Sequence, residues 1–283
     1  MTETDDATTL LAIYAHPDDE TFGTGGTLAR ISAEGRRVVL VCATRGEAGE
    51  ISKPELATPE TLGAVREAEL RCAVEALGIA EVIFLGYRDS GMAGTAENDD
   101  PRAFCQQRTD VVVRQLVEII RRERPGAIVT FDPSGGYGHP DHIAIHHHAT
   151  AAISAAGAVT FAPDLGAPWR TPRTWWMVIT RDAISAMRDA MDEAGMDTTW
   201  TDDLIESQAG WPDDDIDLLV DVSRYGEHKR RAFECHATQF GEDNMFRRAS
   251  DALQDLLLSR EAFVLAAENR ERGGPLTSLF QDQ

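Results

Sequence analysis

Lysine is almost absent from this chain of 283 residues, in which Lys53 and Lys229 are the only two examples. Lysine and arginine together number 27 against 48 acidic residues, which gives a formal net charge of −21. Duplex nucleic acid and anionic membranes both attract positively charged surfaces. The charge balance therefore argues against nucleic acid and membrane as partners.

The chain also lacks any apolar run of the roughly 18 residues that a transmembrane helix needs. Its first ten residues, MTETDDATTL, are polar and acidic, whereas a signal peptide starts with basic and continues with apolar residues. Cysteine occurs at positions 42, 72, 105 and 235 without a C-x-x-C pair, and we interpret all four as buried free thiols. Free thiols suit a reducing compartment, so we expect a soluble, cytoplasmic protein.

Strand and helix patterns alternate at close spacing through the first half of the chain. Apolar runs predict strands at residues 9–15, 37–43, 81–85 and 127–131, and helical patterns fill the intervals at 24–34, 59–77 and 102–124. Continuous apolar strands separated by helices are typical of a parallel sheet with both faces covered. Because such crossovers are right-handed, we predict a Rossmann-like, doubly wound α/β fold with a mostly parallel sheet.

The pattern weakens after about residue 157. Residues 174–180 and 217–222 read as strands, 182–194 and 227–238 as helices, 197–215 as an acidic irregular segment, and 260–268 as a last apolar segment. No internal repeat and no linker marks a domain boundary. We therefore predict a single domain over residues 1–283, in which 1–160 form the Rossmann-like core and 161–283 continue the sheet and add a capping lobe.

The loop after the first predicted strand contains AHPDDE, residues 15–20. Loops at the carboxyl ends of parallel strands carry the function of such sheets. Three carboxylates and an imidazole in five residues would be unstable together unless a cation or a proton neutralised them. Pro17 forces a turn, so His16 and Asp19 can point to one spot with Asp18 beside them. An imidazole and a carboxylate supply two of the three protein ligands of an open zinc site.

The loop after the fourth predicted strand has matching chemistry. It reads FDPSGGYGHPDH over residues 131–142, and its glycines let the backbone pass close to a ligand. His142 completes a set of two histidines and one aspartate, which leaves one coordination position for water. Two such loops indicate a metal site more strongly than either does alone.

AHPDDE near the N-terminus together with GYGHPDH in mid-chain resembles the LmbE/PIG-L family of zinc-dependent N-acetylglucosaminyl deacetylases. The resemblance extends to RDSGMAG at 88–94, to the helix at 66–78 and to HATQ at 236–239, so it covers most of the chain. The motifs are most similar to those of the actinobacterial branch that acts on mycothiol precursors or mycothiol conjugates.

The resemblance implies a role for each of several residues. His16, Asp19 and His142 would hold one Zn²⁺ per chain, with Fe²⁺ or another divalent ion as the alternative. Asp18 would be the general base, Tyr137 and His139 would serve the oxyanion, and Asp141 would orient a histidine. Arg66 and Asp89 match positions that grip sugar hydroxyls, and Glu47, which follows the second predicted strand, would face the same crevice.

These roles fit the hydrolysis of an amide. The expected activity is metal-dependent deacetylation of an N-acetylglucosamine-containing small molecule by attack of an activated water. Two alternatives remain: an amidase that cleaves a glucosamine-linked thiol conjugate, and a sugar- or nucleotide-binding module without turnover. The composition leaves homo-oligomerisation open.

Some features have competing interpretations. The GTGG sequence at 23–26 invites a dinucleotide-binding interpretation, but it does not fit G-x-G-x-x-G, and no acidic residue closes the second predicted strand. His146 lies four residues after His142 and could approach the metal, although a surface-facing helix side is the expected arrangement. His236 of HATQ either lines the pocket or has a capping or core role.

Overall fold

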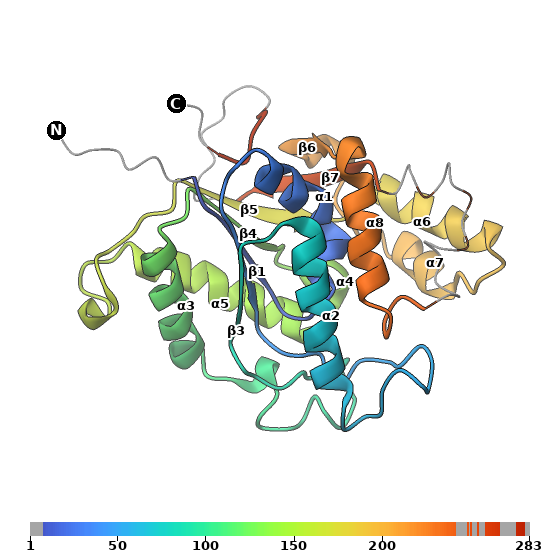
Figure 1. The fold of residues 1–283 in the computed structure, drawn as a ribbon, viewed down its shortest axis with the longest axis horizontal. Coiled ribbons are helices and arrows are strands. Elements are labelled where there is room, and N and C mark those ends of the chain that lie inside the picture. Colours follow the sequence, from blue (N-terminus) through green and yellow to red (C-terminus); the bar gives the residue numbers. More distant parts are fainter. Residues whose placement is uncertain are drawn as a thin grey trace.

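The structure, a computed structural model, describes residues 8–241, 248, 250, 254, 258–266 and 276–280. In this part of the chain, strands form one seven-stranded sheet in the order β3-β2-β1-β4-β5-β7-β6 (Figure 1). The pairs among β1 to β5 are parallel, and β7 runs antiparallel to both of its neighbours. The predicted mostly parallel α/β sheet is therefore confirmed. The strands are β1 (Leu10–Tyr14), β2 (Val38–Cys42), β3 (Glu81–Phe84), β4 (Ala127–Phe131), β5 (Arg173–Val178), β6 (Leu218–Asp221) and β7 (Arg260–Leu265).

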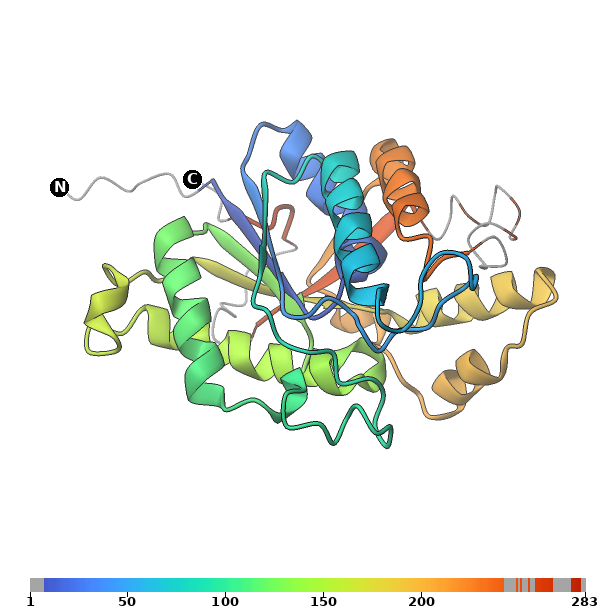
Figure 2. The same ribbon diagram turned by 60° about the horizontal axis from the view of Figure 1, so that its bottom comes forward.

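Helices cover both faces of the sheet, as continuous apolar strands require. Helices α1, α2 and α8 pack together over one face, and α3 and α5 pack together over the other (Figure 2). Helices α6 and α7 lie together at one end of the molecule, beyond α8 (Figure 1). The helices are α1 (Asp19–Ala33), α2 (Leu62–Leu77), α3 (Thr109–Glu123), α4 (Gly135–Gly138), α5 (Pro140–Ala156), α6 (Arg181–Glu193), α7 (Thr199–Glu206) and α8 (Gly226–Cys235).

Strand order places the two motif loops side by side. From β1 the chain builds outward through β2 to β3, and then returns to β4 on the other side of β1. The direction in which successive strands are added to the sheet therefore reverses between β1 and β4, which pair in parallel. Ligands of doubly wound sheets bind at the carboxyl ends of strands at such a switch point. The AHPDDE loop follows β1 and the GYGHPDH loop follows β4, so both lie there.

Several predicted boundaries were wrong for local reasons. Helix α1 begins at Asp19 instead of residue 24, because the carboxylates of Asp19 and Glu20 occupy its first turn, where the helix dipole favours negative charge. The helix predicted at 102–124 is a 3₁₀ turn at Phe104–Gln106 followed by α3. The segment 197–215, predicted as irregular, contains α7. The last apolar segment is β7 as far as Leu265, and residues 267–268 lie outside the described part.

The glycines of GTGG serve helix packing. They lie inside α1. A Cβ atom on Gly23 would lie 1.7 Å from Cε of Met177, and one on Gly26 would lie 2.5 Å from Cβ of Val222. A side chain at Gly26 would push α1 away from Val222 just after β6, whereas one at Gly23 would require the flexible end of the Met177 side chain to move aside. Close packing of the helix on the sheet thus explains the glycines, and no dinucleotide-binding turn is needed to account for them.

The prediction of four free thiols was wrong for two of them. Cys72 of α2 and Cys235 of α8 form a disulfide with an S–S distance of 2.02 Å, and Cys42 and Cys105 are free. The two helices stand side by side (Figure 1), so the disulfide joins residues that are 163 positions apart in the sequence. Among the helices of the described residues, none is both long and apolar enough to cross a membrane.

Candidate metal and catalytic site

Three predicted metal ligands converge at the switch point. His16 and Asp19 come from the turn between β1 and α1, and His142 comes from the first turn of α5. Nδ1 of His16 lies 3.1 Å from Nε2 of His142, which lies 3.2 Å from Oδ1 of Asp19. The remaining separation, from Nδ1 of His16 to Oδ2 of Asp19, is 3.8 Å. Tetrahedral ligands with bonds near 2.1 Å stand about 3.4 Å apart, so these spacings suit one metal ion.

When both histidine rings are neutral, their other hydrogen bonds leave the two facing nitrogens without protons. Nδ1 of His142 lies 3.1 Å from the carbonyl oxygen of Gly135, which only accepts, so this nitrogen carries the hydrogen. Nε2 of His16 lies 3.2 Å from Oδ2 of Asp141 and 3.3 Å from Oδ1 of Asp89, so it also carries a hydrogen. In neutral rings, lone pairs therefore face each other across 3.1 Å. That contact requires a cation or an additional proton between them.

The hydrogen bonds of Asp19 likewise leave one of its two carboxylate oxygens free to bind a metal. Its Oδ2 accepts hydrogen bonds from the backbone N–H groups of Ala15 and His16, at 3.1 and 2.7 Å, which leaves Oδ1 towards His142. Although burial alone would raise its pKa, His142 and His16 hold the pKa of Asp19 well below its usual range. The carboxylate is therefore charged and directed at the two ring nitrogens, as a metal ligand must be.

Two other groupings of possible ligands occur among the described residues. A ring nitrogen of His139 lies within 4.8 Å of ligand atoms of His16 and His142, and Asp89 and Asp141 lie within the same distance of His16. The second grouping uses the Nε2 side of His16, whose hydrogen already faces those carboxylates. Such carboxylates fix the orientation of a metal-binding histidine. The contact places Asp141 beside His16, and its role in orienting that histidine stays a prediction.

Asp18 lies next to the metal ligands in an unusual backbone conformation. Its φ of 110° and ψ of −26° are left-handed, which costs a residue other than glycine about 1–3 kcal/mol. Its side chain is 20 % exposed, and its Oδ2 accepts a 3.0 Å hydrogen bond from Arg66. Burial raises the pKa of Asp18 to about 6, although Arg66 opposes the shift. An accessible carboxylate of this kind suits a general base near neutral pH.

His139 and Tyr137 stand beside the same point. Nδ1 of His139 accepts a hydrogen bond from the backbone N–H of Asp141, so its Nε2 carries the hydrogen in the neutral ring. Burial and the neighbouring His16 and His142 lower the pKa of His139 to about 3, so the ring is a neutral donor. The Tyr137 ring lies 5.1 Å from that of His142 and is 42 % exposed at the mouth of the site.

The three predicted substrate contacts are already engaged with protein groups. Arg66 is 3 % exposed and donates to the carbonyl oxygens of Pro17 and Gly46, at 2.6 and 2.9 Å, besides Asp18. Asp89 accepts hydrogen bonds from the N–H groups of Ala48 and Gly91 and faces His16. Glu47 accepts a hydrogen bond from the N–H of Asp89. Arg66 is thus not bonded to Asp89, and the sugar-binding role of all three stays a prediction.

Sequence reasoning missed one contact and misplaced another residue. Glu20 belongs to AHPDDE but received no role, and it lies between Asp18 and His236: one carboxylate oxygen accepts from the Asp18 N–H at 2.9 Å, and the other lies 2.8 Å from Nε2 of His236. His146 was expected on an exposed face of its helix, but it is buried, and its Nδ1 lies 2.8 Å from the carbonyl oxygen of Phe131 at the end of β4. Only the motif position of Glu20 could have suggested its importance.

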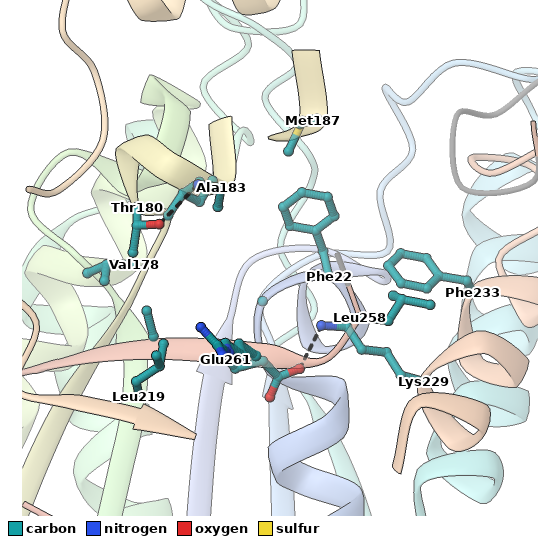
Figure 3. A pocket seen from close by; sticks show the side chains of 14 residues that line it. Phe22, Val178, Thr180, Ala183, Met187, Leu219, Lys229, Phe233, Leu258 and Glu261 are labelled. Carbon is teal, nitrogen blue, oxygen red and sulfur yellow. Dashed lines mark hydrogen bonds and ion pairs between the residues drawn. The ribbon is translucent and has the colours of Figure 1, made fainter. Parts of the chain in front are cut away.

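A small apolar pocket lies behind the first turn of α1 (Figure 3). Its volume is about 90 Å³, and Phe22, Met187 and Phe233 are among its walls. At its base, Lys229 donates to Glu261 at 2.6 Å, and both side chains are buried. Glu261 also accepts from backbone N–H groups inside α1. Among the described residues, none of the predicted site residues lines this pocket. Because Glu261 bonds to both Lys229 and α1, the ion pair helps to hold α1 in place.

The chain is similar to known proteins over most of its length. The family described as PIG-L, GlcNAc-PI de-N-acetylase, matches residues 11–153. A 1D-myo-inositol 2-acetamido-2-deoxy-alpha-D-glucopyranoside deacetylase from Geodermatophilus obscurus is 39% identical over 272 residues, covering 92% of each chain. A protein of the same name from Rhodococcus jostii is 39% identical over 287 residues, covering 96% of this chain and 97% of its own. The solved N,N'-diacetylchitobiose deacetylase from Pyrococcus horikoshii has a TM-score of 0.65 at 21% identity, covering 92% of this chain and 84% of its own, and supports the fold.

Proposed function

Because this chain belongs to the PIG-L family of GlcNAc-PI de-N-acetylases, we propose that its substrate is 1D-myo-inositol 2-acetamido-2-deoxy-alpha-D-glucopyranoside. The reaction class follows from the family: the chain is an amide hydrolase that removes the acetyl group from an N-acetylglucosamine-containing small molecule. The inositol aglycone is the finer step, and it rests on relatives that align over nearly the whole chain.

The residues at the switch point fit a divalent metal, and we propose zinc. The observation that carries this choice is the pair of facing nitrogens of His16 and His142, both left without hydrogens by their other contacts, with the free oxygen of Asp19 beside them. Two imidazoles and one carboxylate form a typical donor set for catalytic zinc. When bound, such an ion supplies a Lewis acid and lowers the pKa of a coordinated water to about 7.

The side chains around this point can carry out the proton transfers. Asp18 is proposed to accept a proton from the attacking water and to return it to the leaving amine. His139 presents an N–H donor, and Tyr137 presents a hydroxyl, from the loop on the other side of the metal ligands. Both are suited to donate hydrogen bonds to the oxygen that becomes negatively charged during attack on the amide.

The test measures both the free amine and the acetate that are formed by protein loaded with one equivalent of Zn²⁺. The substrate panel contains N-acetylglucosaminides with inositol, malate or phosphatidylinositol as the aglycone, together with a mycothiol S-conjugate. We expect the inositol compound to give the highest kcat/KM and to yield one acetate per free amine formed. A higher kcat/KM for amine formation from the S-conjugate, without acetate, would show that conjugate cleavage is the principal activity. The absence of acetate release from every member would reject deacetylation.

A further inference from the structure

The proposed base is held in a conformation that its own residue type disfavours. Asp18 is one of four described residues other than glycine with a positive φ, and its φ of 110° lies furthest into that region. It provides no side-chain cap to α1. Other parts of the structure must therefore keep its backbone in place and thereby aim its carboxylate.

The carbonyl oxygen of Asp18 accepts from the backbone N–H groups of Thr21 and Phe22 in the first turn of α1, and its N–H is held by a side chain. Oε2 of Glu20 accepts the N–H of Asp18 at 2.9 Å, so the Glu20 side chain folds back over the turn that precedes α1. Its other oxygen, Oε1, accepts from the hydroxyl of Thr21 at 2.5 Å and lies 2.8 Å from Nε2 of His236. Glu20 and His236 are both fully buried, so water does not compete for these hydrogen bonds.

His236 is itself fixed by contacts that do not reach the site. It follows Cys235, which the disulfide joins to Cys72 of α2. Two residues later, Thr238 donates from its backbone and hydroxyl groups to the two carboxylate oxygens of Glu69, at 2.7 and 2.6 Å. The HATQ segment is therefore attached to α2 at two points, and His236 extends from it towards Glu20.

We propose that Glu20 and His236 form a positioning pair, in which His236 orients the Glu20 carboxylate so that it holds the Asp18 backbone and aims the Asp18 side chain. Neither is a catalytic residue, because both act through Asp18. The inference deepens the proposed function and rests on it, since it takes Asp18 as the base. It gives the HATQ motif a role: to bring a hydrogen-bond donor from the far end of the chain to the turn that carries the base.

The kinetic test compares substitutions at His236. His236→Gln keeps an N–H donor near the position of Nε2, whereas His236→Leu has none. We expect His236→Leu to lower kcat at least about tenfold with KM and zinc content unchanged, because a hydrogen bond to a charged group is lost. His236→Gln should recover most of that kcat. Glu69→Gln is the matched control: it weakens the attachment of HATQ without touching Glu20, and should lower the melting temperature more than kcat.

Two further measurements keep the outcome clear. In an Asp18→Ala background, His236→Leu should have no further effect on residual kcat, because the residue that it positions is gone. A crystal structure of zinc-loaded His236→Leu does not depend on turnover, and in it Asp18 should have left its left-handed backbone conformation. An unchanged Asp18 backbone in that structure would reject the positioning role of Glu20 and His236, even if the wild type proved inactive. Inactivity of the wild type alone would reject only the proposed function.

Discussion

Replacement of Arg66 distinguishes support of the base from direct binding of the sugar. Its guanidinium donates to Asp18 and to the carbonyl oxygens of Pro17 and Gly46 while almost fully buried. Arg66→Ala removes a charge-assisted hydrogen bond to Asp18, which contributes about 1.5–3 kcal/mol. If that contribution aims the base, kcat falls about 10- to 100-fold with little change in KM.

The same substitution should also destabilise the fold. It leaves the buried carbonyl oxygen of Pro17 without its donor, at a cost of about 1–3 kcal/mol, whereas the carbonyl oxygen of Gly46 keeps the N–H of Gly49 at 3.2 Å. At about 2–4 °C per kcal/mol for a large domain, the melting temperature should fall by roughly 2–12 °C. This differs from the expectation for an exposed sugar ligand, whose removal leaves the melting temperature nearly unchanged.

The assay is steady-state kinetics on zinc-loaded wild type, Arg66→Ala and Arg66→Lys, with differential scanning calorimetry of each. Arg66→Lys keeps the charge but cannot reach three acceptors in a planar fork, so it should lie between the other two in both readings. A raised KM with kcat and melting temperature unchanged would refute the reasoning. Arg66 would then bind the sugar, as the family resemblance implies.

Three further predictions concern the metal, the base and the core. His142→Ala should lose zinc and activity together by metal analysis and turnover, and full occupancy in that variant would exclude His142 as a ligand. Asp18→Ala should keep its zinc but lower kcat at least about a hundredfold; if it lost zinc while Asp19→Ala retained it, the two roles would be exchanged. Lys229→Met should lower the free energy of unfolding in urea by about 3–5 kcal/mol, because Glu261 becomes an unpaired buried charge. A loss below about 1 kcal/mol, the usual contribution of an exposed ion pair, would show that Lys229 does not compensate a buried charge.

The architecture of the first half was predictable because its signals are local. Each of β1, β2 and β4 is buried along its whole length, so its residues read as continuous apolar runs. The ends of α1 and α3 were less predictable. The start of α1 depends on the turn at Asp18, and the start of α3 depends on how the segment after β3 returns across the sheet through Phe104–Gln106. Helix α7 was missed because its acidic residues resemble those of an exposed loop.

The convergence of the three predicted metal ligands was predictable for a similar reason. His16 and Asp19 lie three residues apart, and His142 belongs to a loop of the same composition, so chemistry and spacing both point to a cation. The tautomers could not be predicted, because they depend on Gly135 and Asp141 accepting from the outer ring nitrogens. A motif identifies which residue types meet, whereas the folded chain decides which atoms remain free.

The surroundings of Asp18 show most clearly what could not be predicted from the sequence. Arg66 reaches it from α2, and His236 acts on it through Glu20 from the end of α8, 216 residues away from that glutamate. The disulfide between Cys72 and Cys235 ties together the same two helices. No local pattern in the sequence links these positions, since each is brought close only by helices that pack on one face of the sheet. If the base is aimed from both helices, substitutions at Arg66 and His236 should affect kcat in a non-additive way, because they act on one carboxylate.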